Sequence, residues 1–156
     1  MTPKKILFVC LGNICRSPSA EAVMFELLKQ HNLENIIELD SAGIIDYHEG
    51  ELADSRMREH ATKRGIQILH RSRPVKSPTD FDYFDLIIGM DNENIRALNA
   101  LARTSEHKQK IFKMTDFRKS LLYDYVPDPY YGGSEGFELV LNILDDSCRG
   151  LLEKLS

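Results

Sequence analysis

Residues 5–23 read KILFVCLGNICRSPSAEAV, and this stretch decides the fold because it joins an apolar run to a helical pattern. Residues 5–9 are apolar and β-prone, which predicts a buried strand. From Pro18 onward the apolar residues fall at helical spacing, which predicts a helix. The loop over residues 10–17 therefore ends at a helix N-terminus, where unpaired backbone N–H groups and the helix dipole favour a bound phosphate.

The same loop carries side chains suited to a nucleophile that handles phosphate. Cys10 lies close to the helix N-terminus, which favours its thiolate form, and Arg16 offers a planar fork that matches phosphate oxygens. The Ser17 hydroxyl can hold the sulfur anion, Gly12 gives the loop conformational freedom, and Asn13 tolerates a left-handed backbone. Each residue alone fits an ordinary structural role, but their joint occurrence at one strand–helix junction favours catalysis. A nucleotide-binding P-loop is excluded, since that motif is longer and ends in Gly-Lys-Ser/Thr.

Strand and helix patterns alternate along the rest of the chain. Further strands are expected over residues 36–39, 84–89 and 110–114, and further helices over residues 54–64, 92–102 and 134–155. Repeated strand–helix units predict an α/β fold, a parallel sheet with helices on both faces. In such sheets a ligand binds beyond the carboxyl ends of the strands, and Cys10, Ser41 and Asp91 end three of them.

Length, composition and charge narrow the class of protein. The chain has 156 residues, 42% of them hydrophobic, so residues 1–156 are expected to form one compact domain. A formal net charge of -4 argues against nucleic acid as a partner. No apolar run is long enough for a membrane span, and the first one is too short for a signal peptide. We therefore expect no membrane partner and a cytoplasmic location.

The cysteines and histidines indicate a reducing compartment and chemistry without a metal. Three cysteines, an odd number, do not make a secreted disulfide framework and fit a reactive thiol. The five histidines show no metal-ligand spacing, and we interpret residues 48–51 as a solvated loop. We therefore expect neither a metal nor another cofactor.

Residues 10–23, CLGNICRSPSAEAV, resemble the signature of the low molecular weight protein tyrosine phosphatases. Other segments typical of that family follow in the same order: DSAG at 40–43, His70, MD at 90–91 and VPDPYYG at 126–132. The resemblance extends nearly end to end. It implies a single-domain, flavodoxin-like α/β fold whose four-stranded parallel sheet has the order 2-1-3-4, with helices on both faces.

The resemblance also implies a role for each matching residue. The nucleophile, phosphate clamp, thiolate stabiliser and general acid of the family correspond, in that order, to Cys10, Arg16, Ser17 and Asp128. The polar residues that brace the loop correspond to Asn13, Ser41 and His70. The implied reaction is hydrolysis of phosphotyrosine and small aryl phosphates through a cysteinyl-phosphate intermediate, with inorganic phosphate as the product. Phosphotyrosine-containing proteins are the expected partners, and a monomer is the expected state.

A general acid is needed because a phenol leaves poorly as its anion. Asp128 lies between Pro127 and Pro129, which restrict the backbone and can hold the carboxyl over the site. On the residues alone an ordinary Pro-Asp-Pro turn fits equally well, and the resemblance favours the acid. Asp124 and Asp91 are the alternatives, although the first fits a solvated loop charge and the second a helix N-cap.

Substrate choice is expected to depend on the rim of the cleft. By resemblance, the residues that contact substrate are Leu11, Gly12, Asn13, Ile14, Cys15, Tyr47 and Tyr130. A deep slot walled by rings admits phosphotyrosine more readily than phosphoserine. Related enzymes that act on phosphoarginine carry threonine where this chain has Ile14, so Ile14 predicts phosphotyrosine. Tyr47 fits an ordinary surface tyrosine equally well.

Cys15 permits a redox hypothesis besides simple packing. It lies on the same loop as Cys10, so its thiol can trap an oxidised Cys10 as a disulfide before irreversible oxidation. The two roles are compatible, and both stay open. Cys148 is expected to pack within the apolar face of the last helix.

Three other functions fit parts of the pattern. An arsenate reductase on this scaffold needs a further pair of shuttle cysteines, and only Cys148 remains for that role. A non-catalytic phosphate-binding module would lose the nucleophile or the acid, whereas Cys10, Arg16 and Asp128 are all present. A flavin-binding protein of this fold would carry a Ser/Thr-rich phosphate loop without a Cys-x5-Arg pattern. These functions therefore rank below a phosphatase.

Overall fold

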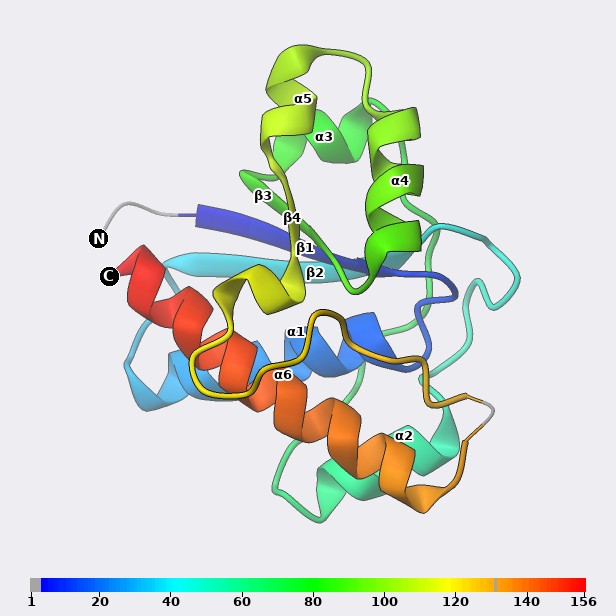
Figure 1. Ribbon diagram of the computed structural model, residues 1–156, viewed down its shortest axis with the longest axis vertical. Helices are drawn as coiled ribbons and strands as arrows, with labels where there is room; N and C mark the ends of the chain where they lie inside the picture. Colours follow the sequence, from blue (N-terminus) through cyan, green and yellow to red (C-terminus); the bar gives the residue numbers. More distant parts are fainter. Residues whose placement is uncertain (1–3, 131) are drawn as a thin grey trace.

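A four-stranded parallel sheet crosses the centre of the molecule (Figure 1). The computed structural model describes residues 4–130 and 132–156. The strands are β1 (Lys4–Cys10), β2 (Ile37–Gly43), β3 (Leu86–Gly89) and β4 (Ile111–Lys113). Their order across the sheet is β2-β1-β3-β4, and every neighbouring pair is parallel. This confirms both the expected α/β class and the strand order 2-1-3-4.

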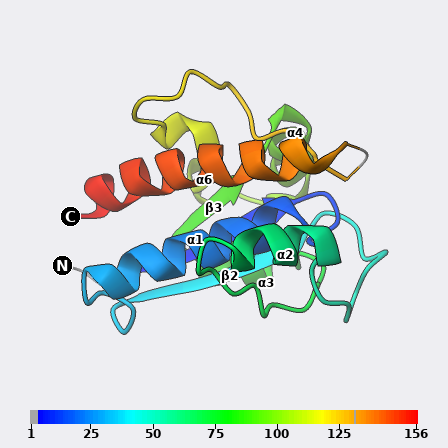
Figure 2. The ribbon, with the colours of Figure 1, turned by 90° about the horizontal axis from the view of Figure 1, so that it is seen from below.

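Helices cover both faces of the sheet (Figures 1 and 2). One face carries α1 (Arg16–Gln30), α2 (Ser55–Thr62) and α6 (Ser134–Leu155). The other carries α3 (Thr79–Tyr83), α4 (Asn92–Leu101) and α5 (Ser105–Gln109). A short 3-10 helix, η1 (Met114–Phe117), follows β4. The sheet is thus the middle of three layers.

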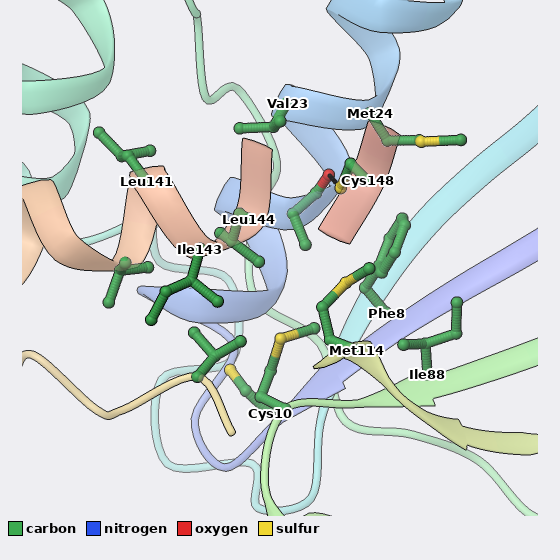
Figure 3. Packing of buried hydrophobic residues seen from close by; sticks show 14 of the residues in the cluster. Phe8, Cys10, Val23, Met24, Ile88, Met114, Leu141, Ile143, Leu144 and Cys148 are labelled. Carbon is green, nitrogen blue, oxygen red and sulfur yellow. Dashed lines mark hydrogen bonds between the residues drawn. The ribbon is translucent and has the colours of Figure 1, made fainter. Parts of the chain in front are cut away.

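Strand β1 contributes to two hydrophobic clusters because successive side chains on a strand point to opposite faces. Ile6 and Phe8 pack in the cluster under α1, α2 and α6, which Figure 3 shows around Phe8. Leu7 and Val9 pack in the second cluster, against Phe81 and other residues from the opposite face. Burial on both faces explains why this strand is a continuous apolar run rather than an alternating one.

Several expected boundaries differ in the structure. Helix α1 begins at Arg16 rather than Pro18, because proline is tolerated within the first turn, where N–H groups have no helical partner. Strand β2 runs through Gly43, so Ser41 lies inside the strand and the prediction that it ends the strand was wrong. Strand β3 ends at Gly89, with Asp91 just beyond it.

The shortest helices carried no sequence signal. Helices α3 and α5 have 5 residues each and η1 has 4, which is too short for a periodic apolar pattern to stand out. Helix α2 is shorter than the predicted 54–64. Asp54 is its N-cap, since its side chain accepts N–H bonds from Arg56 and Met57.

None of the helices in the described part of the chain combines the length and the apolar character that crossing a bilayer requires.

The register of the sheet brings the carboxyl ends of three strands together. Cys10 pairs with Gly43 across β1 and β2, and Val9 pairs with Gly89 across β1 and β3. The loops that leave these strands therefore start at one edge of the sheet, where parallel sheets hold their ligands.

Candidate active site

The loop between β1 and α1 turns at Asn13, whose φ is 58°. This is the left-handed region that asparagine tolerates, as the sequence predicted. Gly12, by contrast, is not among the described glycines with positive φ. A Cβ at Gly12 would lie 3.2 Å from Cδ2 of His48. The glycine thus gives the His48 ring room to approach the loop, and a positive φ is not what requires glycine at this position.

Cys10 lies at the start of this loop with a hydroxyl beside its sulfur. Its side chain is buried, and its Sγ lies 3.0 Å from Ser17 Oγ. Asn13 Nδ2 donates to the same hydroxyl oxygen at 2.7 Å. Because Ser17 accepts that bond, its own hydrogen can be donated to the sulfur, a charge-assisted bond when Cys10 is a thiolate.

Asn13 is the centre of a buried network that fixes the loop from behind. Its Nδ2 also donates to Ser41 Oγ at 3.1 Å. Its Oδ1 accepts the backbone N–H of Arg73 at 3.0 Å and lies 2.9 Å from His70 Nε2. The structure therefore brings the three predicted bracing residues, Asn13, Ser41 and His70, into direct contact, from three separate parts of the chain.

Two carboxylates stand behind His70. Its Nδ1 lies 3.4 Å from Glu21 Oε1 and 3.4 Å from Asp40 Oδ1. Burial raises the pKa of Glu21 to about 7, although the Ser41 hydroxyl, which donates to Oε1 at 2.7 Å, opposes that shift. Among the described residues, Glu21, Asp40 and His70 form a group whose ligand atoms are close enough together to hold a cation. Both carboxylates already have protein donors, Ser41 on Glu21 and Arg73 on Asp40.

Arg16 approaches the loop from the first turn of α1, and its side chain is nearly inaccessible to solvent. Its Nη1 donates to Asp91 Oδ2 at 2.6 Å and to the Val126 carbonyl at 3.1 Å. Asp91 also caps α4, since its Oδ1 accepts the Asn94 N–H at 2.8 Å. The predicted N-cap role of Asp91 is therefore confirmed. Its pairing with Arg16 went unpredicted, because Arg16 begins α1 and Asp91 follows β3, 75 positions further along the chain.

Asp128 faces Arg16 from the loop that precedes α6. Its Oδ2 lies 3.7 Å from Arg16 Nη2, and its Oδ1 accepts the Tyr130 N–H at 3.0 Å. The side chain is 38% exposed, so a substrate or a water molecule can reach it. Asp124 is exposed and does not line the cleft.

A cleft of about 350 Å³ opens over the loop. Its lining includes the predicted residues Cys10, Leu11, Gly12, Ile14, Cys15, Arg16, Tyr47, Asp128 and Tyr130. Ile45 and His48 also line it, and the sequence singled out neither for this wall. The His48 ring makes an edge contact with Tyr47 at 4.8 Å between centroids and lies 6.4 Å from the Tyr130 ring. Three rings therefore stand at the rim.

The family described as low molecular weight phosphotyrosine protein phosphatase matches residues 5–156. The chain belongs to this family.

Individual members cover nearly the whole chain. The human low molecular weight phosphotyrosine protein phosphatase is 38% identical over 154 residues, which span 97% of this chain and 95% of that protein. The crystal structure of a protein tyrosine phosphatase from Entamoeba histolytica, with Hepes in its active site, is 52% identical. It superposes with a TM-score of 0.94 and covers 97% of this chain and 96% of its own. A Drosophila arginine phosphatase is 32% identical, with a TM-score of 0.88 and coverage of 97% and 98%.

The two cysteines of this phosphatase other than Cys10 are both buried. Cys15 is buried and is one of the residues that line the cleft. Burial, followed by the nearby Asp54 carboxylate, raises the pKa of its thiol well above the usual range. Cys148 is fully buried, with Sγ 3.9 Å from the Ala20 carbonyl. Its predicted packing in the apolar face of α6 is confirmed (Figure 3).

His48 and Ile45 are the residues lining the phosphatase cleft that the sequence did not single out. His48 stands in a stretch of charged and polar residues, DYHEGE at 46–51, whose composition is typical of a solvated loop. Gly12 gave no clear signal for it, because a loop glycine in a sequence indicates conformational freedom as readily as a close neighbour.

Proposed function

We propose that this phosphatase hydrolyses phosphotyrosine in proteins, with Cys10 as nucleophile, Arg16 as phosphate clamp and Asp128 as general acid. The observation that carries the proposal is the Ser17 hydroxyl 3.0 Å from Cys10 Sγ, in a cleft lined by both Arg16 and Asp128. The Cys10 sulfur, a guanidinium and a carboxyl then surround one space large enough for a phosphotyrosine side chain.

The first step forms a bond between Cys10 Sγ and phosphorus and breaks the bond to the tyrosine oxygen. Asp128 donates its proton to that oxygen, so tyrosine leaves as the neutral phenol. The Arg16 guanidinium neutralises charge on the transferring phosphoryl group. In the second step Asp128 accepts a proton from water, the water oxygen attacks phosphorus, and the sulfur leaves as the thiolate. The products are tyrosine and inorganic phosphate.

Phosphotyrosine is the proposed substrate because of the cleft wall. Ile14 and the rings of Tyr47, His48 and Tyr130 line it, and flat rings favour an aromatic side chain. The Drosophila relative is named for action on arginine, so phosphoarginine is the competing substrate. Peptides of one sequence that differ only in the phosphorylated residue should give the highest kcat/KM for phosphotyrosine. Ile14→Thr should shift the ratio toward phosphoarginine, and a wild-type preference for phosphoarginine would overturn the assignment.

The covalent mechanism is tested by substituting the nucleophile. Cys10→Ser should abolish turnover, whereas Cys148→Ala should retain it, because Cys148 lies in the core away from the cleft. Acid quenching of the wild-type reaction should leave a phosphoryl group on the peptide that contains Cys10. Turnover by Cys10→Ser, or loss of wild-type turnover on adding a chelator, would contradict the mechanism.

We also propose that residues 1–156 form one domain, that the protein is a cytoplasmic monomer, and that Asn13, Ser41 and His70 support the loop. Packing of the helices on one sheet supports the single domain. The three free, buried thiols support a reducing compartment. Light scattering at micromolar concentration would test the monomer.

A further inference from the structure

The N-terminus of α2 is fastened to the phosphate loop. The Asp54 N–H donates to the Ile14 carbonyl at 2.8 Å. The Asp54 carboxylate then caps α2 and accepts two bonds from the Arg56 guanidinium, Oδ1 from Nε at 3.1 Å and Oδ2 from Nη2 at 2.9 Å. Asp54 therefore connects Arg56 by hydrogen bonds to the loop that carries the nucleophile.

Arg56 reaches from α2 to the loop that carries Asp128. Its Nη2 donates to the Tyr130 carbonyl at 3.1 Å. Its guanidinium carbon lies 5.7 Å from the Tyr130 ring centroid and 4.9 Å from the Phe137 ring centroid. The carbonyl and the ring of Tyr130 are thus both in contact with one side chain.

Tyr130 is also the residue that orients the acid. Its N–H donates to Asp128 Oδ1 at 3.0 Å, which leaves Oδ2 toward Arg16. A shift of the Tyr130 backbone would move the donor that fixes the Asp128 carboxyl. Because Asp128 itself is 38% exposed, packing alone holds it weakly.

We propose that Arg56 is a positioning residue that holds the Asp128 loop in register with the nucleophile loop. The inference rests on the proposed function, since it assumes that Asp128 is the acid. Arg56 touches no reacting atom in this scheme; it acts through Tyr130 on the direction of the Asp128 carboxyl. The connection runs from Ile14 to Asp54, Arg56, Tyr130 and Asp128, and it links the two loops across the outside of the cleft.

This role differs from a simple contribution to stability. The Arg56 side chain is 47% exposed, and exposed ion pairs contribute little to folding because water screens them. Displacement of a catalytic group by about 1 Å, however, can cost up to about a hundredfold in rate. Loss of Arg56 should therefore affect proton donation much more than the melting temperature.

The test uses the full chain and two substrates that differ in leaving group. Arg56→Met keeps an apolar stem beside the two rings and removes the donors. We expect kcat/KM for a phosphotyrosine peptide to fall about tenfold, and kcat/KM for dinitrophenyl phosphate, whose phenol needs no proton, to fall less than about twofold. Arg56→Lys, which retains the positive charge and a single donor nitrogen, should fall between wild type and Arg56→Met.

Arg64→Met is the matched control. Arg64 joins the end of the α2 region to α6 through Glu138 Oε1 at 2.7 Å and Asn142 Oδ1 at 2.8 Å. These bonds do not involve the residues around Asp128. We expect Arg64→Met to leave the ratio of the two kcat/KM values at the wild-type level.

A double substitution decides whether Arg56 acts through Asp128. Adding Arg56→Met to Asp128→Asn should reduce kcat/KM for phosphotyrosine by less than about twofold further, because there is no acid left to position. Equal loss on both substrates for Arg56→Met, or multiplication of the two single losses in the double variant, would overturn the positioning role. Absence of leaving-group dependence in Asp128→Asn itself would overturn the acid assignment and the inference with it.

Discussion

Arg16 is held by the protein before any phosphate arrives. Its Nη1 is bonded to Asp91 and to the Val126 carbonyl, and only 4% of the side chain is exposed. A buried guanidinium with fixed partners cannot swing away, so its second nitrogen, Nη2, keeps one direction toward the Asp128 side of the cleft. The residue therefore enters the reaction already oriented, which lowers the cost of assembling the transition state.

The loss of kcat/KM in Asp128→Asn should depend on the basicity of the departing oxygen of the substrate. We expect kcat/KM on phosphotyrosine to fall by about a hundredfold or more, the usual scale for a positioned proton donor, with a much smaller loss on dinitrophenyl phosphate. Arg16→Lys should lower both rates alike, because the clamp acts on the phosphoryl oxygens whatever the leaving group. Should Asp124→Asn or Asp91→Asn show the leaving-group dependence instead, the acid would be a different carboxylate.

Mild peroxide should link Cys10 to Cys15 reversibly. Peroxide would oxidise the Cys10 thiolate to a sulfenic acid. The Cys15 thiolate would then attack its sulfur, which forms the S–S bond and releases hydroxide, and the hydroxide takes a proton from solvent. Burial raises the pKa of Cys15, so its thiolate fraction, and the rate of disulfide formation, should rise as the pH is raised above neutral. Peptide mapping and recovery of activity by a thiol reductant check this. Sulfinic or sulfonic acid at Cys10 with Cys15 untouched would contradict it.

At the scale of the elements, α6 packs against η1 so closely that one position admits only glycine. A Cβ on Gly150 would overlap the Phe117 carbonyl. The first turn of the same helix is open by comparison, since a Cβ on Gly136 would lie 3.6 Å from Pro129 Cβ, an ordinary contact. A side chain is therefore excluded at Gly150 and can be accommodated at Gly136.

Gly150→Ala should lower the free energy of unfolding by about 3 kcal/mol, because the helix and the η1 backbone must move apart. Gly136→Ala should raise it by up to about 1 kcal/mol, since alanine restricts the unfolded chain and favours the helix. Denaturant unfolding of both variants measures the two changes. Equal effects of the two substitutions would mean that α6 can shift freely on η1.

The strands and the long helices could be predicted, and the short helices could not. Strand β1 and helix α6 have apolar patterns long enough to define their period, whereas α3, α5 and η1 span 4 or 5 residues. In the site, the residues of one contiguous motif could be predicted, and a pair that joins distant parts of the chain could not. Cys10, Arg16 and Ser17 lie in one contiguous motif, but the Arg16–Asp91 pair joins residues 75 positions apart. That pair depends on the register of β1 and β3, which no local pattern specifies.

At the scale of the whole molecule, the anion site lies where the carboxyl ends of the strands meet α1, so bound anion should stabilise the entire fold. A phosphate or tungstate concentration 100 times the dissociation constant should add about 2.7 kcal/mol to the free energy of unfolding. Thermal unfolding with increasing anion measures this. Arg16→Met should lose most of the effect, and an equal rise for both proteins would indicate nonspecific salt action.

The hydrogen bonds of Asn13 have a consequence for how the protein loses activity. They join the catalytic loop to β2 through Ser41 and to residues 70–73 through His70 and the Arg73 amide. The loop cannot come apart alone without leaving these buried polar groups unpaired, so its opening should be as rare as global unfolding. Amides of this loop should exchange with deuterium as slowly as those of β1, and activity should disappear at the same denaturant concentration as the circular dichroism of the fold. Loss of activity at a clearly lower concentration would show that the loop melts as a separate unit.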